Sequence, residues 1–195
     1  MDTSSEQLAI AIGKAMGGGQ SSAYEGTVFC QGLNHMMSYA ISVYPRACMW
    51  SATSRPDGPT RTFDTQRLII QTDGVDDPYA LSIDRIPAAF PESVQLSFPL
   101  SLPIWGRRLD DYHPIACEVN GSDTTLLLRH RVDPTIFGSF TFDTESGIAK
   151  TFFTPTKALK LEREFPPEND KHNFGFVAGC GDPDLQDRLR RDQPS

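Results

Sequence analysis

The sequence feature that most constrains the fold is the dipeptide Asn120-Gly121, which separates two runs of aliphatic and β-branched residues. A type I′ turn needs positive φ at both central positions, and Asn-Gly adopts that conformation more readily than almost any other pair. Residues 113–132 therefore predict a β-hairpin made of two antiparallel strands joined by a tight turn.

Two registers are open for this hairpin, and both have an even loop length. A loop of Asn120-Gly121 alone places His113 opposite Leu128, and a loop of residues 120–123 places His113 opposite His130. Because side chains alternate along a strand with period two, both registers put the same residues on one face, whereas a three-residue bulged loop would break this parity. We expect the core face to carry His113, Ile115, Cys117, Val119, Thr124, Leu126, Leu128 and His130.

The rest of the chain continues this alternating pattern. Short apolar/polar runs lie between turns rich in Pro, Gly and Asp, which predicts nine or ten strands, two of them over residues 135–142 and 148–154. Sequential hairpins of this kind are typical of an antiparallel up-and-down β-barrel of the calycin-like type, with a two-sheet β-sandwich as the alternative. The barrel is preferred because a closed meander leaves no edge strand exposed.

Two further segments need a choice between patterns. Residues 37–43 alternate as a half-buried strand but also present one helical stripe, and their serine and β-branched residues favour the strand. Residues 94–100 alternate cleanly between apolar and polar positions. They predict another strand, and the neighbouring prolines indicate that it lies at a sheet edge or breaks there.

A helix is predicted at the N-terminus, over residues 4–16. A capping box begins it, Gly17-Gly18-Gly19 ends it, and its apolar stripe consists of Leu8, Ala11, Ile12 and Ala15. We expect it to cap one end of the β scaffold. The predicted organisation is a helix and joint over 1–22, a single antiparallel β domain over 23–165, and a polar tail over 166–195 with a short helix.

Charge and composition limit the partners of the chain. Its 195 residues include 18 Lys and Arg against 25 Asp and Glu, and the net charge of −7 argues against general nucleic-acid binding. No apolar run approaches the roughly 20 residues that cross a bilayer, and the first residues do not resemble a secretory signal. The four cysteines form no ligand pair. We expect a cytoplasmic protein with reduced thiols, no cofactor and no membrane partner, and leave the oligomeric state open, a homodimer included.

Asp111, His113 and His130 are the candidate catalytic residues. Two imidazoles on one strand face, with a carboxylate nearby to fix a tautomer, could act as a general acid and base. The alternative is that His113 is solvated and His130 is a core histidine bonded to backbone. No metal is predicted, because these three side chains would form an open site whose geometry nothing fixes.

Inward-facing aromatic residues form the second candidate site. Many apolar rings with a few polar groups are the usual lining of a small-molecule pocket, and an arginine beside them can hold a carboxylate or phosphate. The candidate ligand-binding residues are Trp50, Leu128, Phe140, Phe142, Phe152, Arg107 and Tyr112.

The leading functional hypothesis is therefore a small-molecule-binding β-barrel for a hydrophobic or aromatic ligand. One alternative is a cofactor-free isomerase, cyclase or lyase that uses His113, His130 and Asp111. The other is a non-catalytic interaction module, in which the N-terminal helix or the tail docks on a partner. Sequence motifs for nucleotide binding, serine hydrolysis and zinc proteolysis are absent.

Overall fold

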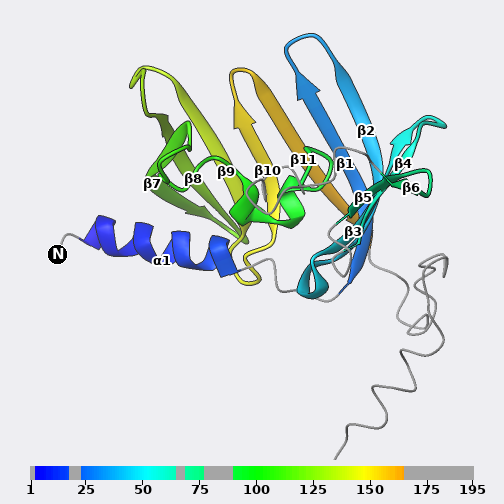
Figure 1. The fold of residues 1–195 in the computed structure, drawn as a ribbon. Coiled ribbons are helices and arrows are strands. Elements are labelled where there is room, and N and C mark those ends of the chain that lie inside the picture. The colour runs from blue at the N-terminus through cyan, green and yellow to red at the C-terminus, as the bar shows by residue number, and fades with distance from the viewer. Residues whose placement is uncertain (1–2, 18–22, 65–68, 77–89, 165–195) are drawn as a thin grey trace, which may run out of the picture. The chain divides into compact units, whose positions relative to one another are not determined.

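The computed structural model describes residues 3–17, 23–64, 69–76 and 90–164 (Figure 1). The predicted tail over 166–195, with its short helix, lies outside these residues. The elements in chain order are helix α1 (Thr3–Gly17), strands β1 (Tyr24–Gly32) and β2 (Met36–Tyr44), turn η2 (Pro45–Ala47), strands β3 (Met49–Arg55), β4 (Thr60–Asp64), β5 (Ile69–Thr72) and β6 (Val75–Asp76), turns η4 (Gln95–Ser97) and η5 (Pro99–Ser101), and strands β7 (Tyr112–Asn120), β8 (Asp123–His130), β9 (Phe137–Asp143), β10 (Ala149–Thr154) and β11 (Lys157–Glu164).

The described strands form one 11-stranded antiparallel sheet in the order β6-β5-β4-β3-β2-β1-β11-β10-β9-β8-β7. Two meanders, β1 to β6 and β7 to β11, join through the pairing of β1 with β11. The mainly β, antiparallel fold class with an N-terminal helix is thereby confirmed. The sheet is not closed, because β6 and β7 stand at opposite ends of this order. The predicted barrel closure is therefore not formed between the described strands.

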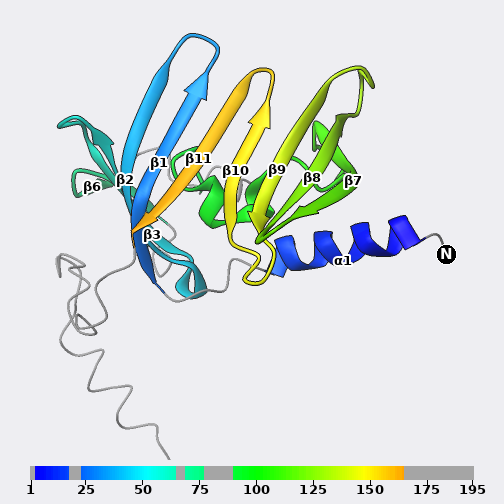
Figure 2. The ribbon, with the colours of Figure 1, turned by 180° about the vertical axis from the view of Figure 1, so that it is seen from behind.

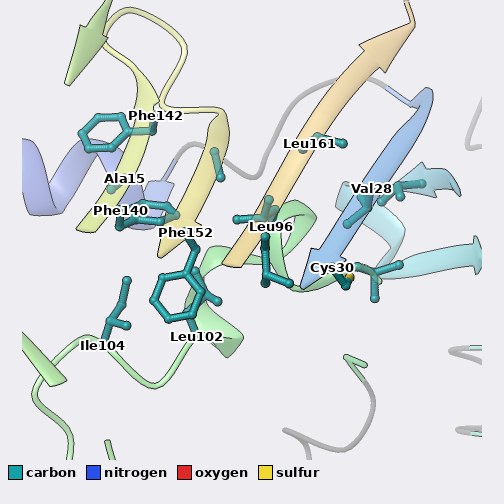
Figure 3. Close-up of a cluster of buried hydrophobic side chains, with 14 of the residues drawn as sticks. Ala15, Val28, Cys30, Leu96, Leu102, Ile104, Phe140, Phe142, Phe152 and Leu161 are labelled. Carbon is teal, nitrogen blue, oxygen red and sulfur yellow. The ribbon is translucent and has the colours of Figure 1, made fainter. Parts of the chain in front are cut away.

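One face of the sheet is apolar because alternate positions on successive strands carry large hydrophobic side chains. Strand β8 follows the predicted pattern, with Thr124, Leu126 and Leu128 buried and Leu127 exposed. The core continues onto the neighbouring strands (Figure 3), and its largest fully buried sheet side chains are Trp50, Phe140, Phe142, Leu126, Leu128, Leu159, Val28 and Val43.

Residues 90–110, which we call the cover, lie across this apolar face. The 3-10 turns η4 and η5 of the cover are in front of the sheet in Figure 1 and behind it in Figure 2. The strand predicted over 94–100 is wrong. Phe98 N–H donates to Gln95 O at 3.1 Å and Leu102 N–H to Pro99 O at 3.0 Å, which closes two consecutive turns. Pro99 has no N–H with which to join a strand ladder, so the apolar residues reach the core from turns instead.

Helix α1 packs against β7, β8 and η5. Ala11 and Ala15 are buried, and Leu8 and Ile12 pack against the core. Lys14 Nζ also donates to Thr144 O at 3.1 Å, in the turn between β9 and β10. The predicted apolar stripe of the helix is therefore the surface that contacts the sheet.

The β7–β8 hairpin turns where predicted, but not through a type I′ turn centred on Asn120-Gly121, and it has an additional bulge. Val119 pairs with Thr124 and Asn120 with Asp123, so Gly121 and Ser122 form the loop, and Gly121 has a positive φ of 60° whereas Asn120 does not. The register shifts between Pro114 and Ala116, because proline cannot donate to the ladder and strands bulge where pairing breaks.

This bulge changes which residues face each other at the far end of the hairpin. His113 pairs with Arg129, and Tyr112 pairs with His130. The predicted pairing of His113 with Leu128 or His130 is therefore wrong. By the alternation of the strand, the imidazoles of His113 and His130 lie on opposite faces of the sheet.

Candidate functional site

The candidate site is the apolar layer between the sheet and the cover. On the side of β3 and β4, a series of aromatic rings connects the two. Trp50 stacks on Phe63 with ring centroids 6.3 Å apart, Phe63 meets the edge of Phe90 at 6.4 Å, and Phe90 contacts Phe98 at 4.4 Å. Trp50 and Phe63 belong to the sheet, whereas Phe90 and Phe98 belong to the cover. Aromatic contacts of this kind hold the cover by apolar packing.

A second aromatic contact joins the cover to strand β9. The Trp105 ring meets the Phe140 ring edge-on at 5.8 Å, and Phe140 stacks on Phe142 at 5.9 Å. Figure 3 shows three buried aliphatic side chains of the cover spread along this layer: Ile104 on the side of Phe140, Leu102 near Phe152, and Leu96 closer to β11.

Six of the seven predicted ligand-binding residues lie together in this layer. All six are buried, and they belong to the same hydrophobic cluster as the buried residues of the cover. They are Trp50, Leu128, Phe140, Phe142, Phe152 and Tyr112. The structure thus brings together residues from β3, β7, β8, β9 and β10. Their role in binding stays a prediction.

Arg107, the seventh residue, holds the cover together instead of pointing into the layer. Its Nε donates to Asp110 Oδ2 at 3.0 Å, and its two terminal nitrogens donate to Leu100 O and Leu102 O, both at 2.7 Å. Asp110 Oδ2 also accepts the backbone N–H of Trp105 at 2.9 Å. The predicted anion clamp at Arg107 would have to compete with these bonds.

We call the hydrogen bonds among Asp110, Arg107 and Trp105 the Asp110 network. Arg131 connects this network to the end of the β7–β8 hairpin. Its guanidinium donates to Arg107 O at 2.8 Å and Arg108 O at 2.9 Å, and its backbone N–H donates to Asp111 O at 2.8 Å. Charge-assisted bonds of this type are about twice as strong as neutral ones. The C-terminal end of the cover is therefore firmly held.

The N-terminal end of the cover is held by an ion pair. Lys157 Nζ of β11 lies 2.7 Å from Glu92 Oε1 of the cover. Cys30, 2% exposed, is close enough to both charges that they act on its thiol. Burial raises the pKa of Cys30 to about 12, the Glu92 carboxylate adds to this rise, and Lys157 partly offsets both. We call Cys30, Tyr39, Glu92 and Lys157 the Lys157 cluster.

Tyr39 belongs to this cluster by its position in the sheet, because it pairs with Val28 and so stands on the same face as Cys30. Burial raises the pKa of Tyr39, and the negative groups Cys30 and Glu92 add to that rise, while the positive charge of Arg61 opposes it. A phenol, a carboxylate and two cations therefore lie at this end of the apolar layer.

A second buried phenol lies on β1. Burial raises the pKa of Tyr24, and the Ser97 hydroxyl and the charge of Arg163 partly offset this rise. The Arg163 guanidinium stands 4.0 Å over the Tyr24 ring, which is a cation–π contact.

The cover also encloses polar side-chain oxygens. Gln95 Oε1 in η4 and Ser101 Oγ in η5 are buried and have no hydrogen-bond partner among the described residues.

The three predicted catalytic residues are only partly brought together. His130 is half-buried, its ring meets Tyr112 at 5.1 Å, and its Nδ1 accepts the backbone N–H of Asp133 at 3.0 Å. His113 faces the other side of the sheet, and Asp111 is exposed. The core-histidine alternative, with His130 bonded to backbone, matches this geometry.

Sequence reasoning missed the carboxylate and the ion pair that hold the cover. Asp110, not its neighbour Asp111, is the buried acid, and the spacing of Arg107 and Asp110 by three residues could have indicated it. The ion pair between Glu92 and Lys157 joins residues 65 positions apart in the sequence, and no local sequence pattern predicts it.

The described part of the chain has neither a metal-binding cluster nor a membrane-spanning helix. It contains no group of three or more His, Cys, Asp and Glu side chains placed to hold a metal ion. Its helix α1 is not long and apolar enough to span a bilayer, and no other described helix is.

The fold and the site define a mainly β protein with an open antiparallel sheet and an irregular cover over its apolar face. No family model matches the chain, and no curated protein matches it. Among solved structures it is similar to MucB in complex with MucA(peri), at 9% identity and a TM-score of 0.42 over 87% of this chain and 60% of that one.

Two further solved structures are similar at the same level. MucB alone is 10% identical with a TM-score of 0.43, over 88% of this chain and 64% of that one. An uncharacterized conserved protein from Thermus thermophilus is 9% identical with a TM-score of 0.43, over 84% of this chain and 90% of that one. The chain spans about three fifths of the MucB chains that it matches.

Proposed function

We propose that the chain binds an apolar small molecule between its sheet and its cover. The observation that carries this proposal is the cover itself. An irregular segment, built of turns and not paired to any strand of the described sheet, covers a wide apolar sheet face. A segment outside the strand ladder can move aside for a ligand without breaking the sheet.

The apolar layer supplies the affinity for such a ligand. Each Å² of apolar surface removed from water contributes about 25 cal/mol, and the aromatic side chains Trp50, Phe63 and Phe140 are large and rigid. The rings of Phe90 and Phe98 already occupy part of this layer. A hydrophobic or aromatic ligand would replace these cover contacts with contacts of its own.

The two ends of the cover differ in how they are held. The Asp110 network fixes the C-terminal end through several charge-assisted bonds. At the N-terminal end, the described charged contact is the part-exposed Glu92–Lys157 pair, and such pairs are worth roughly 0.2–1 kcal/mol. The cover therefore opens from Glu92 while remaining attached near Asp110.

Displacement of an apolar fluorophore tests the proposal. N-phenyl-1-naphthylamine bound in the layer is expected to accept energy from Trp50 and Trp105, and dodecanoic acid should displace it. The control variant combines Leu127→Ser with Phe153→Ser on the opposite sheet face, where both side chains are exposed, and it should bind the dye equally. Loss of binding in this control, or dye that no apolar compound displaces, would contradict the proposal.

The other hypotheses stay predictions. A cofactor-free isomerase, cyclase or lyase would need His113 and His130 to act together, and the bulge at Pro114 gives them opposite faces. An interaction module that docks through α1 would have to use the exposed side of that helix, which carries Ile10 and Met16. A cytoplasmic location and a homodimeric state also remain predictions.

A further inference from the structure

The charged contact between Glu92 and Lys157 bears on the chemistry of the ligand. It joins the cover to the sheet, so Glu92 has to leave Lys157 when the cover opens from that end. The Lys157 side chain is 26% exposed and extends from the face of β11 that also carries the buried Leu159. Opening therefore separates a largely enclosed ammonium from its carboxylate.

A cation in such a position is costly when its counter-ion is removed. The part-exposed pair itself holds the cover only weakly, but a ligand that enters beside Lys157 would bury its ammonium, and a buried ammonium without a partner is destabilising. A neutral ligand that displaced the cover would leave this imbalance uncorrected.

We propose that the ligand is an apolar monocarboxylate, and that its carboxylate takes the place of Glu92 on Lys157 Nζ. This inference rests on the proposed function and names its ligand class. One carboxylate replaces another, so the number of charges at the Lys157 cluster is unchanged. Lys157 is a compact cation with three donors, which suits a single carboxylate, whereas phosphate recognition more often uses the planar fork of arginine.

Tyr39 is placed to help hold the same group. It pairs with Val28, so by the alternation of the strands its side chain stands on the same sheet face as Cys30, and the charge of Glu92 acts on it. A phenol that donates to a carboxylate adds a charge-assisted hydrogen bond. The apolar part of the ligand then extends from Lys157 past Leu159 into the aromatic layer.

Competition by three ligands that differ only in their head group tests this inference. Dodecanoic acid, dodecanol and dodecylamine, each below its critical micelle concentration, are titrated against bound N-phenyl-1-naphthylamine at pH 7.5. The wild-type chain is expected to prefer the acid over the alcohol by about tenfold or more, which is about 1.4 kcal/mol. The amine should be the weakest of the three.

Variants of the cluster then locate the preference. Lys157→Gln should lower the affinity for the acid to that of the alcohol, and Lys157→Arg should retain most of the preference. Glu92→Gln should tighten binding of the acid, because it removes the competing carboxylate. The matched control is Lys160→Gln on the same strand, where the lysine is 59% exposed and paired with Glu162, and it should behave as wild type.

The outcomes separate this inference from the proposed function. Equal affinities for acid and alcohol in the wild-type chain, or a preference that survives in Lys157→Gln, would overturn the monocarboxylate while leaving apolar binding in place. Failure of all three ligands to displace the dye would overturn the proposed function itself. Retained melting temperatures in each variant establish that the folded protein is being compared.

Discussion

Lys157 Nζ on strand β11 and Glu92 Oε1 in the cover lie 2.7 Å apart, and this ion pair connects two segments that are far apart in the sequence. Cys30 pairs with Leu159 on the same face of the sheet, its thiol is 2% exposed, and the charges of Glu92 and Lys157 act on it. If the pair holds the cover closed, the reactivity of Cys30 reports on the position of the cover.

The first prediction is that Cys30 reacts slowly until the cover opens. In a background of Cys48→Ser, Cys117→Ser and Cys180→Ser, modification of Cys30 by a maleimide at pH 8 should be at least about 100-fold slower than that of exposed Cys48 in the matching single-cysteine protein. Burial and a pKa of about 12 both keep the thiolate population low. Adding Glu92→Gln should raise the rate several-fold. Equal rates of Cys30 modification with and without Glu92→Gln would contradict the prediction, because they would show that the ion pair does not hold the cover closed.

The second prediction concerns the carboxylate at the fixed end of the cover. The Asp110 side chain is 5% exposed and accepts three kinds of N–H donor, from Trp105 and from the backbone and side chain of Arg107. Asp110→Asn should lower the free energy of unfolding in urea by about 2–3 kcal/mol, since an amide N–H₂ then faces N–H donors. Asp111→Asn, at the exposed neighbour, should change it by less than about 0.5 kcal/mol. Similar losses for both would contradict the assignment of the network to Asp110.

The third prediction separates the two histidines of the hairpin. His130→Ala removes the acceptor for Asp133 N–H and the ring contact with Tyr112, so it should cost about 1–2 kcal/mol of stability. His113→Ala, on the opposite sheet face, should cost clearly less. Chemical denaturation of both variants at pH 8 checks this. A larger loss for His113 would argue against the bulged register.

The fourth prediction is a pH dependence that arises in the β9–β10 turn. The backbone N–H and then the hydroxyl of Ser146 hold the pKa of Asp143 below its usual range, with a smaller effect from Lys150. A carboxyl whose pKa is lower in the folded state stabilises the fold above its unfolded pKa and loses that contribution as the pH falls through the folded value. Asp143→Asn should therefore reduce stability at pH 7, and its difference from wild type should shrink as the pH is lowered from about 4 to 2. Glu145→Gln, in the same turn, is the control. If the difference in stability between Asp143→Asn and wild type does not change with pH, the lowered pKa of Asp143 is not the source of the pH dependence.

The strands could be predicted from the sequence because their signals are local. Alternation of apolar residues gives the faces of β8 and β9, and Asn120-Gly121 indicates where the chain turns between β7 and β8. One of the two predicted registers has the observed pairing of Val119 with Thr124, although the loop itself is Gly121-Ser122. The apolar stripe of α1 could be predicted from the sequence in the same way. These elements follow period-two or period-3.6 patterns that short stretches of chain already contain.

The parts that could not be predicted depend on single breaks or on distant contacts. Pro114 breaks one ladder bond, and the resulting bulge moves His113 to the other face, which parity counting alone does not anticipate. Residues 94–100 alternate like a strand but form turns over the core, because Pro99 cannot join a ladder. The contact of Glu92 with Lys157 exists only once the sheet and the cover are assembled.

The most direct test of ligand entry beneath the cover is to join Glu92 to Lys157 covalently and measure ligand uptake. A carbodiimide couples a carboxylate to an amine only where the two touch, and mass spectrometry of the digested protein identifies the resulting amide between the cover and β11. The same treatment of Glu92→Gln provides a protein with every other cross-link but this one. If ligands enter beneath the cover, the joined protein binds N-phenyl-1-naphthylamine at least about tenfold less than the treated variant. Undiminished binding by the joined protein would contradict this route of entry and the site that it leads to.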